Sequence, residues 1–198
     1  MKSKVIGITG SIATGKSVAS ELIRKKGFTV IDADRVAHQL MKRGEKNYQR
    51  LVDYYGDCIV GENGEIDRCK LGKRVFSNKE ELQKLNELTH ADIFNRILEM
   101  INMCEDKVVF IELPILFELL KDGKLGINVD EKWLIYTSPE LQKNRLMKRN
   151  RFSEKEAMDR INSQISVDVK REMADVVIDN SKDLKWLESQ IDFNLERL

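Results

Sequence analysis

Residues 10–17 of this 198-residue chain are GSIATGKS and match the pattern G-x-x-x-x-G-K-[ST]. A short apolar run rich in β-branched residues, 5–8, precedes the pattern, and residues 18–25 follow it with helical spacing. In this strand, loop and helix context the glycines let backbone N–H groups wrap an anion at the positive end of a helix. A chance match in a glycine-rich turn is the alternative, and the context argues against it.

Each part of this loop has a predicted role in binding a polyphosphate. Lys16 is expected to reach the β- and γ-phosphates, and the hydroxyl of Ser17 is the candidate metal ligand, for Mg²⁺. The residues expected to line the phosphates are Gly10, Ser11, Ile12, Ala13, Thr14, Gly15, Lys16, Ser17 and Val18.

Short apolar runs alternate with helical patterns along much of the chain. Runs of this kind predict a parallel sheet covered by helices on both faces, so we expect an α/β fold with five parallel strands. Ligands bind such sheets at the carboxyl ends of the strands. The five runs lie at 5–8, 28–31, 108–111, 133–136 and 176–178.

Two carboxylates, Asp32 and Asp34, follow the second apolar run. In extended backbone, side chains two residues apart point the same way. One carboxylate could then act as a base for an acceptor hydroxyl, and the other could hold it in place. Phosphoryl transfer to an alcohol benefits from such a carboxylate, which orients the oxygen toward the phosphorus. The alternative is that the pair caps the next helix, and spacing does not decide between the two.

Five cations fall within residues 143–151, where there is no acid, although the chain as a whole is balanced in charge. Arg145 and Arg149 are four residues apart and share a helix face. Beside a phosphate-binding loop, such a pair predicts a lid that stabilises the charge on the transferred phosphate. A solvated basic face is the alternative.

Two further residues have open roles. Glu112 ends the third apolar run, where an acid would lie near a metal or serve the structure alone. His90 precedes a predicted long helix, where it would either donate a hydrogen bond to a substrate phosphate or pack between helices.

Composition excludes several classes of protein. Lys plus Arg total 34 and Asp plus Glu total 33, so the chain has no overall basic field to gather nucleic acid or anionic lipid. No apolar run approaches the ~20 residues that cross a bilayer, and we expect no signal peptide. The 3 cysteines form no C-x-x-C pair, which is typical of reduced thiols in a cytosol. We expect a cytoplasmic protein without nucleic-acid or membrane partners, and the sequence leaves its oligomeric state open.

Beyond these motifs, the sequence resembles the dephospho-coenzyme A (dephospho-CoA) kinase family over nearly its whole length. The matching segments are GITG at 7–10, TGKS at 14–17, VIDAD at 30–34, PILFE at 114–118, the stretch 145–164 and ADVVIDN at 174–180.

The resemblance implies a three-layer P-loop kinase fold. Its core would comprise about 1–34, 105–140 and 170–198, its helical substrate-binding insertion about 35–104, and its lid about 141–169. It also implies that ATP, with Mg²⁺, phosphorylates the ribose 3′-hydroxyl of dephospho-CoA to give CoA and ADP.

Single residues gain expected roles from the resemblance. Asp34 matches the family's proposed general base and so contacts the substrate, while Arg145 and Arg149 match basic lid residues that bind phosphate. Asn180 lies near the family's adenine-binding end. Lys16, Asp34 and Arg145 are therefore the expected catalytic residues.

The sequence departs from the family at two places. Ala91 stands where a proline often follows the histidine that corresponds to His90, and Lys182 stands where the family often has glycine. These differences affect the expected substrate contact of His90 and the adenine contacts of the nucleotide, not the loop. From the residues alone, a kinase for another nucleoside or nucleotide, or a nucleotide-sensing switch, stays as an alternative.

Overall fold

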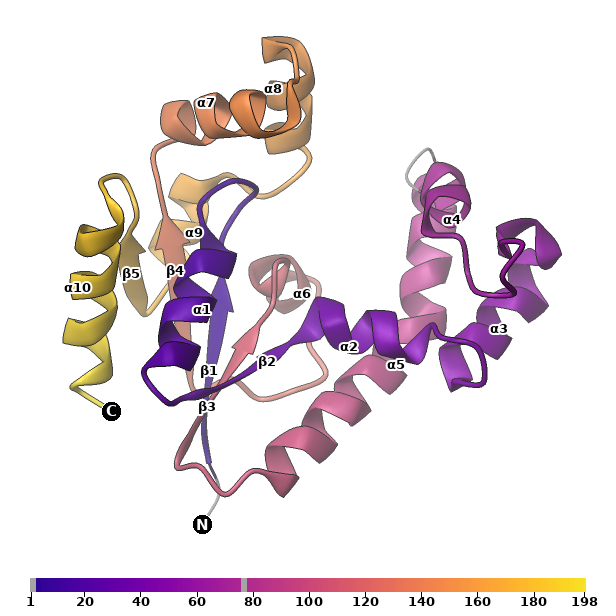
Figure 1. Cartoon of the computed structure of the whole chain (residues 1–198), viewed down its shortest axis with the longest axis horizontal. Helices are drawn as coiled ribbons and strands as arrows, with labels where there is room; N and C mark the ends of the chain where they lie inside the picture. The colour runs from indigo at the N-terminus through magenta and orange to yellow at the C-terminus, as the bar shows by residue number, and fades with distance from the viewer. Residues whose placement is uncertain (1–2, 76–77) are drawn as a thin grey trace. The chain divides into compact units, whose positions relative to one another are not determined.

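The computed structural model describes residues 3–75 and 78–198, which form two compact units. Unit 1 comprises the chain up to Ile31 together with Cys104–Leu198, and unit 2 comprises Asp32–Met103. The phosphate-binding loop belongs to unit 1, and Asp34 and His90 belong to unit 2. Figure 1 labels the helices and strands of both units.

Unit 1 is built from strands and helices that alternate along the chain. The strands are β1 (Lys4–Thr9), β2 (Thr29–Asp32), β3 (Val108–Glu112), β4 (Glu131–Tyr136) and β5 (Val176–Asp179). The helices are α1 (Lys16–Lys25), α6 (Leu116–Lys121), α7 (Pro139–Asn150), α8 (Glu154–Asn162), α9 (Val167–Met173) and α10 (Leu184–Leu195).

The strands form one sheet in the order β2-β3-β1-β4-β5, which confirms the predicted five-stranded parallel α/β architecture. Strand β1 lies in the centre, with Ile6 opposite Phe110 of β3 and Ile8 opposite Trp133 of β4. Because parallel strands end at the same edge, the loop after β1 emerges at the middle of the carboxyl edge of the sheet.

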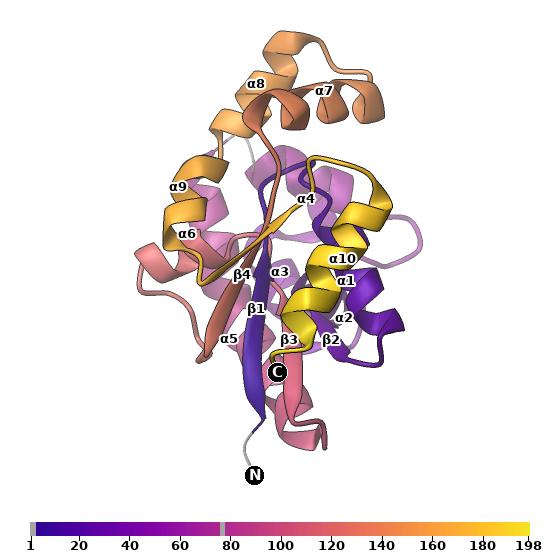
Figure 2. The ribbon, with the colours of Figure 1, turned by 90° about the vertical axis from the view of Figure 1, so that its left-hand side faces the viewer.

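Helices cover both faces of this sheet, so unit 1 has the three layers that the resemblance implies (Figure 2). Alternate strand residues, among them Ile6 and Ile8, pack on one face against α1 and α10 in the largest buried cluster described. On the other face Leu134 packs with Phe117 of α6 and Val167 of α9. The two-residue side-chain period of a strand explains why each run of β-branched residues feeds both layers.

Unit 2 is helical and has its own apolar core. Its elements are α2 (Ala33–Leu40), α3 (Lys46–Tyr55), the 3₁₀ turn η1 (Asp57–Ile59), α4 (Arg68–Val75) and α5 (Lys79–Met103). Its buried cluster contains Leu51, Tyr55, Ile59, Leu71 and Val75.

The local geometry predicted for the two aspartates is wrong. Asp32 and Asp34 do not share an extended segment, since α2 begins at Ala33 and Asp34 falls in its first turn. Asp32 is the N-cap, and its Oδ1 accepts a hydrogen bond from the backbone N–H of Arg35 at 3.0 Å. The capping interpretation therefore holds for Asp32, because a carboxylate satisfies one of the N–H groups that a helix start leaves unpaired.

The predicted position of His90 before a long helix is also wrong. His90 lies inside α5, which begins eleven residues earlier, at Lys79. The helix extends ahead of His90 because Leu82, Leu85 and Leu88 recur every three residues and pack on the unit 2 core.

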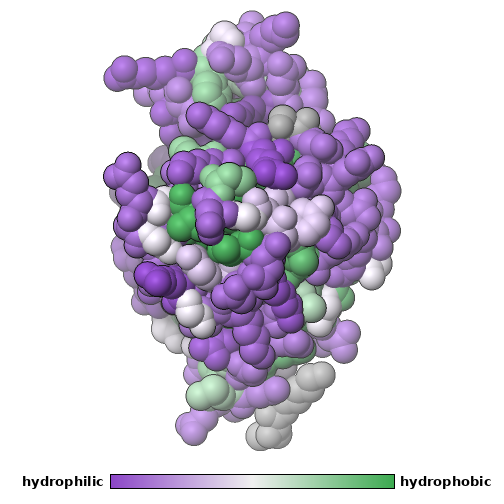
Figure 3. All heavy atoms as spheres, turned by 90° about the vertical axis from the view of Figure 1, so that its right-hand side faces the viewer, coloured by the Kyte–Doolittle hydropathy of each residue, from purple (hydrophilic) through white to green (hydrophobic). Residues whose placement is uncertain are grey.

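Across residues 3–75 and 78–198, no helix combines the length and apolar character needed to cross a membrane. The face of the protein in Figure 3 is mainly hydrophilic, with hydrophobic side chains in a few small areas.

Candidate active site

The phosphate-binding loop connects the central strand β1 to α1, and its two glycines are required by close contacts. A Cβ at Gly10 would lie 2.5 Å from Thr14 Oγ1 and 3.0 Å from the carbonyl oxygen of Ile135. Gly15 has φ 91°, and a Cβ there would collide with the side-chain nitrogen of Asn180. Any side chain at Gly10 or Gly15 would therefore displace these neighbours, and at Gly15 it would also strain the backbone.

The turn of the loop is held in a strained backbone conformation. Ala13 has φ 62°, which costs an alanine about 1–2 kcal/mol relative to its ordinary conformations. The carbonyl oxygen of Ser11 accepts hydrogen bonds from the backbone N–H of Thr14 at 3.2 Å and from Thr14 Oγ1 at 2.9 Å. These two bonds close the turn around Ala13.

Helix α1 begins at Lys16, directly after the loop. Its first turn contains no acidic residue, so no side chain of the helix itself opposes the positive end of its dipole. Ser17 and Val18 are exposed in this turn. The start of α1 therefore has the geometry that favours an anion, with Lys16 and Ser17 in its first turn.

Lys16 forms a largely buried ion pair with Glu112 at the end of β3. Arg24 of α1 lies 3.7 Å from the other carboxylate oxygen of Glu112. Only 6% of the Glu112 side chain is exposed, so the two cations compensate a charge that would be costly to bury alone. Glu112 thus orients the lysine that is expected to bind phosphate.

Three side chains distant in sequence bind the backbone of the loop. The backbone N–H of Ile12 donates to Gln164 Oε1 at 2.9 Å, and Gln142 Nε2 donates to the carbonyl oxygen of Ile12 at 2.6 Å. Asn180 Nδ2 donates to the carbonyl oxygen of Thr14 at 2.8 Å. Sequence reasoning missed both glutamines, since no local pattern marks a residue whose partner lies 130 or 152 positions away.

These contacts also limit which parts of the loop are available to phosphate. The N–H of Ile12 is bonded to Gln164, although Ile12 was expected to line the phosphates. Asn180, a residue outside the loop that was expected to contact the nucleotide, binds the loop through its side-chain amide.

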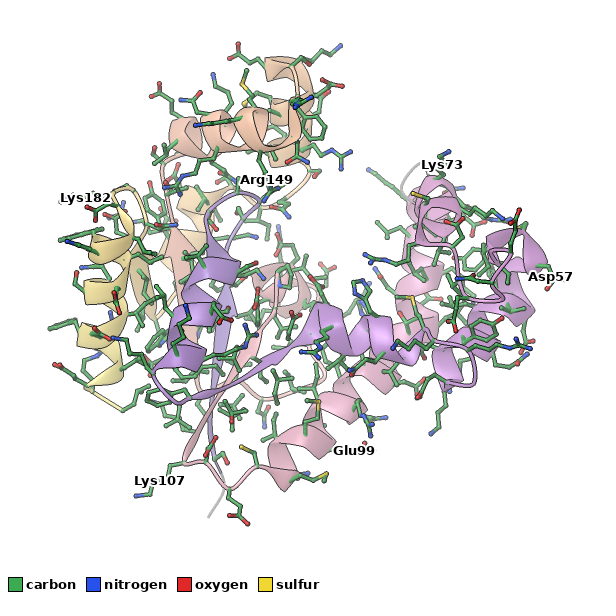
Figure 4. The ribbon with its side chains drawn as sticks, viewed as in Figure 1. Asp57, Lys73, Glu99, Lys107, Arg149 and Lys182 are labelled. Atoms are coloured by element: carbon green, nitrogen blue, oxygen red, sulfur yellow. The ribbon has the colours of Figure 1, made fainter. Side chains whose placement is uncertain are left out.

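The predicted arginine pair lies on α7, which begins with Pro139 after the N-cap Ser138. Arg145 Nη2 donates to the backbone carbonyl of Asn180 at 2.9 Å, and Arg149 Nε donates to Asn150 Oδ1 at 2.9 Å. Arg149 is exposed and lies on the side of α7 that faces the loop (Figure 4). The structure therefore brings Arg145 to the loop through Asn180.

The remaining predicted residues belong to unit 2. Asp34 is exposed on the first turn of α2, two residues after β2 ends. In the sheet, β3 lies between β2 and β1. His90 is half-buried on α5 and packs edge-on against the ring of Phe94, with ring centroids 5.7 Å apart.

Comparison with known proteins assigns a family. The sequence model of the dephospho-CoA kinase family matches residues 4–185. A dephospho-CoA kinase of Carboxydothermus hydrogenoformans is 42% identical over 191 residues, which cover 94% of this chain and 90% of the relative.

Solved structures agree in fold. A protein of Thermus thermophilus aligns with a TM-score of 0.84 at 30% identity, covering 100% of this chain and 99% of the other. A dephospho-CoA kinase of Campylobacter jejuni aligns with a TM-score of 0.67, also at 30% identity, covering 100% and 98%.

Proposed function

Because the chain belongs to the dephospho-CoA kinase family, we propose that its phosphate-binding loop holds ATP for transfer to the ribose 3′-hydroxyl of dephospho-CoA. As a member of this family, the chain is a phosphotransferase that phosphorylates dephospho-CoA in coenzyme A biosynthesis. The observation that carries the proposed roles is the start of α1, where Lys16 follows a glycine-bounded loop and no acidic residue lies in the first turn.

In this proposal the chain stabilises the negative charge of the bound triphosphate and of the phosphoryl group that is transferred. The loop amides and Lys16 bind the β- and γ-phosphates, and Arg145 and Arg149 bind the equatorial oxygens as the phosphoryl group moves. A guanidinium has five N–H donors, and the bond from Arg145 to Asn180 uses one of them, so others can bind phosphate oxygens. The helices α7 and α8 then belong to a lid of about residues 141–169.

Asp34 is the proposed general base. Its carboxylate would accept the proton of the 3′-hydroxyl and orient that oxygen in line with the γ-phosphorus. The helical insertion of about residues 35–104 would bind dephospho-CoA, with His90 donating a hydrogen bond to a substrate phosphate. Asn180 would lie at the adenine end of ATP.

Mg²⁺ fits the donors of this loop. The described part of the chain has no group of three or more His, Cys, Asp or Glu residues that would hold a metal by themselves. Mg²⁺ needs only one or two protein oxygens when phosphates and water complete its octahedron, and the exposed hydroxyl of Ser17 would supply one. The ion would neutralise charge on the phosphates.

We also propose that the protein works in the cytoplasm. Cys58, Cys69 and Cys104 are all free thiols, and the first two are exposed. Exposed thiols persist in reducing compartments, which supports this location.

Product analysis tests the proposed reaction. The protein is incubated with MgATP and dephospho-CoA, and mass spectrometry should find CoA and ADP in equal amounts. Uridine and nucleoside monophosphates, offered separately, should give no phosphorylated product. Turnover of one of these acceptors without turnover of dephospho-CoA would reject the assigned substrate.

Replacement of Lys16 tests the phosphate site. Lys16→Ala should lower kcat at least about 100-fold, because one preorganised charge on the transferred group contributes about that much. The matched control is Lys25→Ala, which removes an exposed lysine from the other end of α1 and should leave kcat within twofold. Equal kcat in the two variants would contradict the role of Lys16.

A further inference from the structure

The peptide groups of Ile12 are held by two side chains from the segment that contains α7 and α8. Gln142 lies on α7, and Gln164 lies between α8 and α9. One glutamine binds the carbonyl oxygen of Ile12 and the other binds its N–H.

The chemistry of these two bonds is fixed by the backbone. A peptide N–H can only donate and a peptide carbonyl can only accept, so Gln164 acts through its oxygen and Gln142 through its nitrogen. Gln142 is completely buried. Gln142 must therefore donate a hydrogen bond and Gln164 must accept one, so a substitution that keeps only an acceptor affects the two positions differently.

The bond from Gln142 sets the direction of the next amide in the loop. In a trans peptide the carbonyl of residue 12 and the N–H of residue 13 point in opposite directions. Gln142 holds the carbonyl of Ile12 and so turns the N–H of Ala13 away from α7. Ala13 is the non-glycine residue of the loop with positive φ, a conformation that persists only when its surroundings enforce it.

We propose that Gln142 and Gln164 are positioning residues that hold the phosphate-binding loop in its anion-binding shape and tie that shape to α7 and α8. Neither glutamine is assigned a contact with the nucleotide. They act through Ile12, so that the N–H of Ala13 and the first turn of α1 meet the phosphates without rearrangement. This inference rests on the proposed function only in taking the bound anion to be a nucleotide polyphosphate.

A loop without these anchors would have to be ordered by the ligand, and that cost lowers affinity. Substitution should therefore weaken nucleotide binding more than it weakens the fold. The apolar cluster that unites β1, α1 and α10 includes neither glutamine.

The first experiment measures ADP binding by calorimetry in the presence of Mg²⁺. Gln142→Met and Gln164→Met each remove one anchor, and each should weaken ADP binding about tenfold. The matched control is Lys143→Met, because Lys143 is the neighbour of Gln142 on α7 but pairs with Glu154 of α8 and not with the loop. The control should bind ADP within twofold of the wild type.

Turnover measurements distinguish a specific effect on the phosphate-binding loop from a general loss of active structure. The KM for ATP should rise in both glutamine variants, and the KM for dephospho-CoA should stay unchanged. ADP affinities equal to that of Lys143→Met, or a rise of both KM values together, would overturn the proposal.

A second pair of variants decides the matter if a methionine variant does not fold. In Gln164→Glu the new carboxylate still accepts a hydrogen bond from the N–H of Ile12. In Gln142→Glu an ionised carboxylate has no N–H to donate to the carbonyl oxygen of Ile12. Both place one carboxyl group beside Ile12, but Gln142 is completely buried and Gln164 is partly exposed. Urea unfolding of each variant therefore measures the cost of burying the charge separately from the ADP affinity. Gln164→Glu should bind ADP at least tenfold more tightly than Gln142→Glu at pH 8, and equal affinities would overturn the proposal.

These outcomes are distinct from a failure of the proposed reaction. ADP binding requires no acceptor, so a wrong assignment of dephospho-CoA leaves the binding comparison intact. A wild-type chain that binds no ADP would reject the phosphate site itself, and this inference with it.

Discussion

At the scale of single residues, two aspartates only two positions apart have different surroundings. Asp32 caps α2 through the N–H of Arg35, whereas Asp34 is exposed on the following turn. A cap fixes where a helix starts, so Asp32 sets the position of the carboxylate that we propose as the base.

The same substitution at both positions separates these roles. Asp34→Asn should lower kcat about 100-fold or more and leave ADP affinity unchanged, because an amide cannot accept the proton. Asp32→Asn should keep both kcat and stability, because asparagine caps a helix as well as aspartate does. Steady-state kinetics and calorimetry provide the measurements.

A third variant completes the comparison. Asp32→Ala should cost about 1 kcal/mol in the free energy of unfolding, measured in urea, because it removes the cap. If Asp32→Asn lost activity and Asp34→Asn kept it, the base would be Asp32.

At the scale of elements, a buried ion pair joins two helices on the same face of the sheet. Lys170 of α9 is completely buried, and its Nζ lies 2.8 Å from Glu118 Oε1 of α6. The same oxygen accepts a hydrogen bond from the backbone N–H of Ile165 at 3.2 Å. The pair holds the last turn of α9 beside α6.

Removing one member of this pair should destabilise the protein more than removing both charges. Lys170→Met should cost about 2 kcal/mol in urea unfolding, less than a fully buried pair would, because 24% of the Glu118 side chain is exposed to water. The double variant with Glu118→Gln should recover most of this loss, since glutamine still accepts from Ile165. A double variant as unstable as the sum of both single variants would contradict the coupling.

At the scale of the whole molecule, Glu131 joins parts of unit 1 that are distant in sequence. It accepts from Lys4 of β1 at 2.8 Å and from the indole N–H of Trp133 at 3.0 Å, and Arg197 lies 3.5 Å away. Burial opposes ionisation of Glu131, but the hydrogen bonds from Lys4 and Trp133 outweigh it and hold the pKa of Glu131 below its usual value.

This lowered pKa predicts a specific loss of stability in acid. A carboxyl group with a lower pKa in the folded state stabilises the protein above its unfolded pKa, near 4.5, and this contribution disappears as the pH falls through the folded pKa. Urea unfolding should therefore show the free energy declining below about pH 5, with a smaller decline in Glu131→Gln. Identical pH dependence in wild type and variant would contradict the contribution of Glu131.

Much of the fold was predictable because its signals are local. The five apolar runs gave the strands, since a strand buried on both faces needs only a short β-branched sequence. The capping box of α8 depends on signals of the same local kind, since Ser153 and Glu156, three residues apart, each accept a hydrogen bond from the other's backbone N–H. Such patterns depend on neighbours within four residues.

Local patterns failed where two structures compete for the same residues. The spacing of Asp32 and Asp34 fits a strand, but α2 begins between them and turns them apart. The histidine at position 90 was expected before a helix, but α5 already includes it because upstream leucines pack on the unit 2 core.

Neighbouring residues are enough to predict a glycine-bounded loop that follows a buried strand and begins a helix, because loop geometry and helix starts depend on adjacent positions. The contacts that hold this loop come from distant parts of the chain and are visible only in the folded molecule. Glu112 reaches Lys16 across 96 positions, and Gln142 reaches Ile12 across 130. These partners meet because the strand order places β3 and β4 on either side of β1. Which distant strands pair cannot be read from sequence periodicity, because periodicity reports only on residues that are close along the chain.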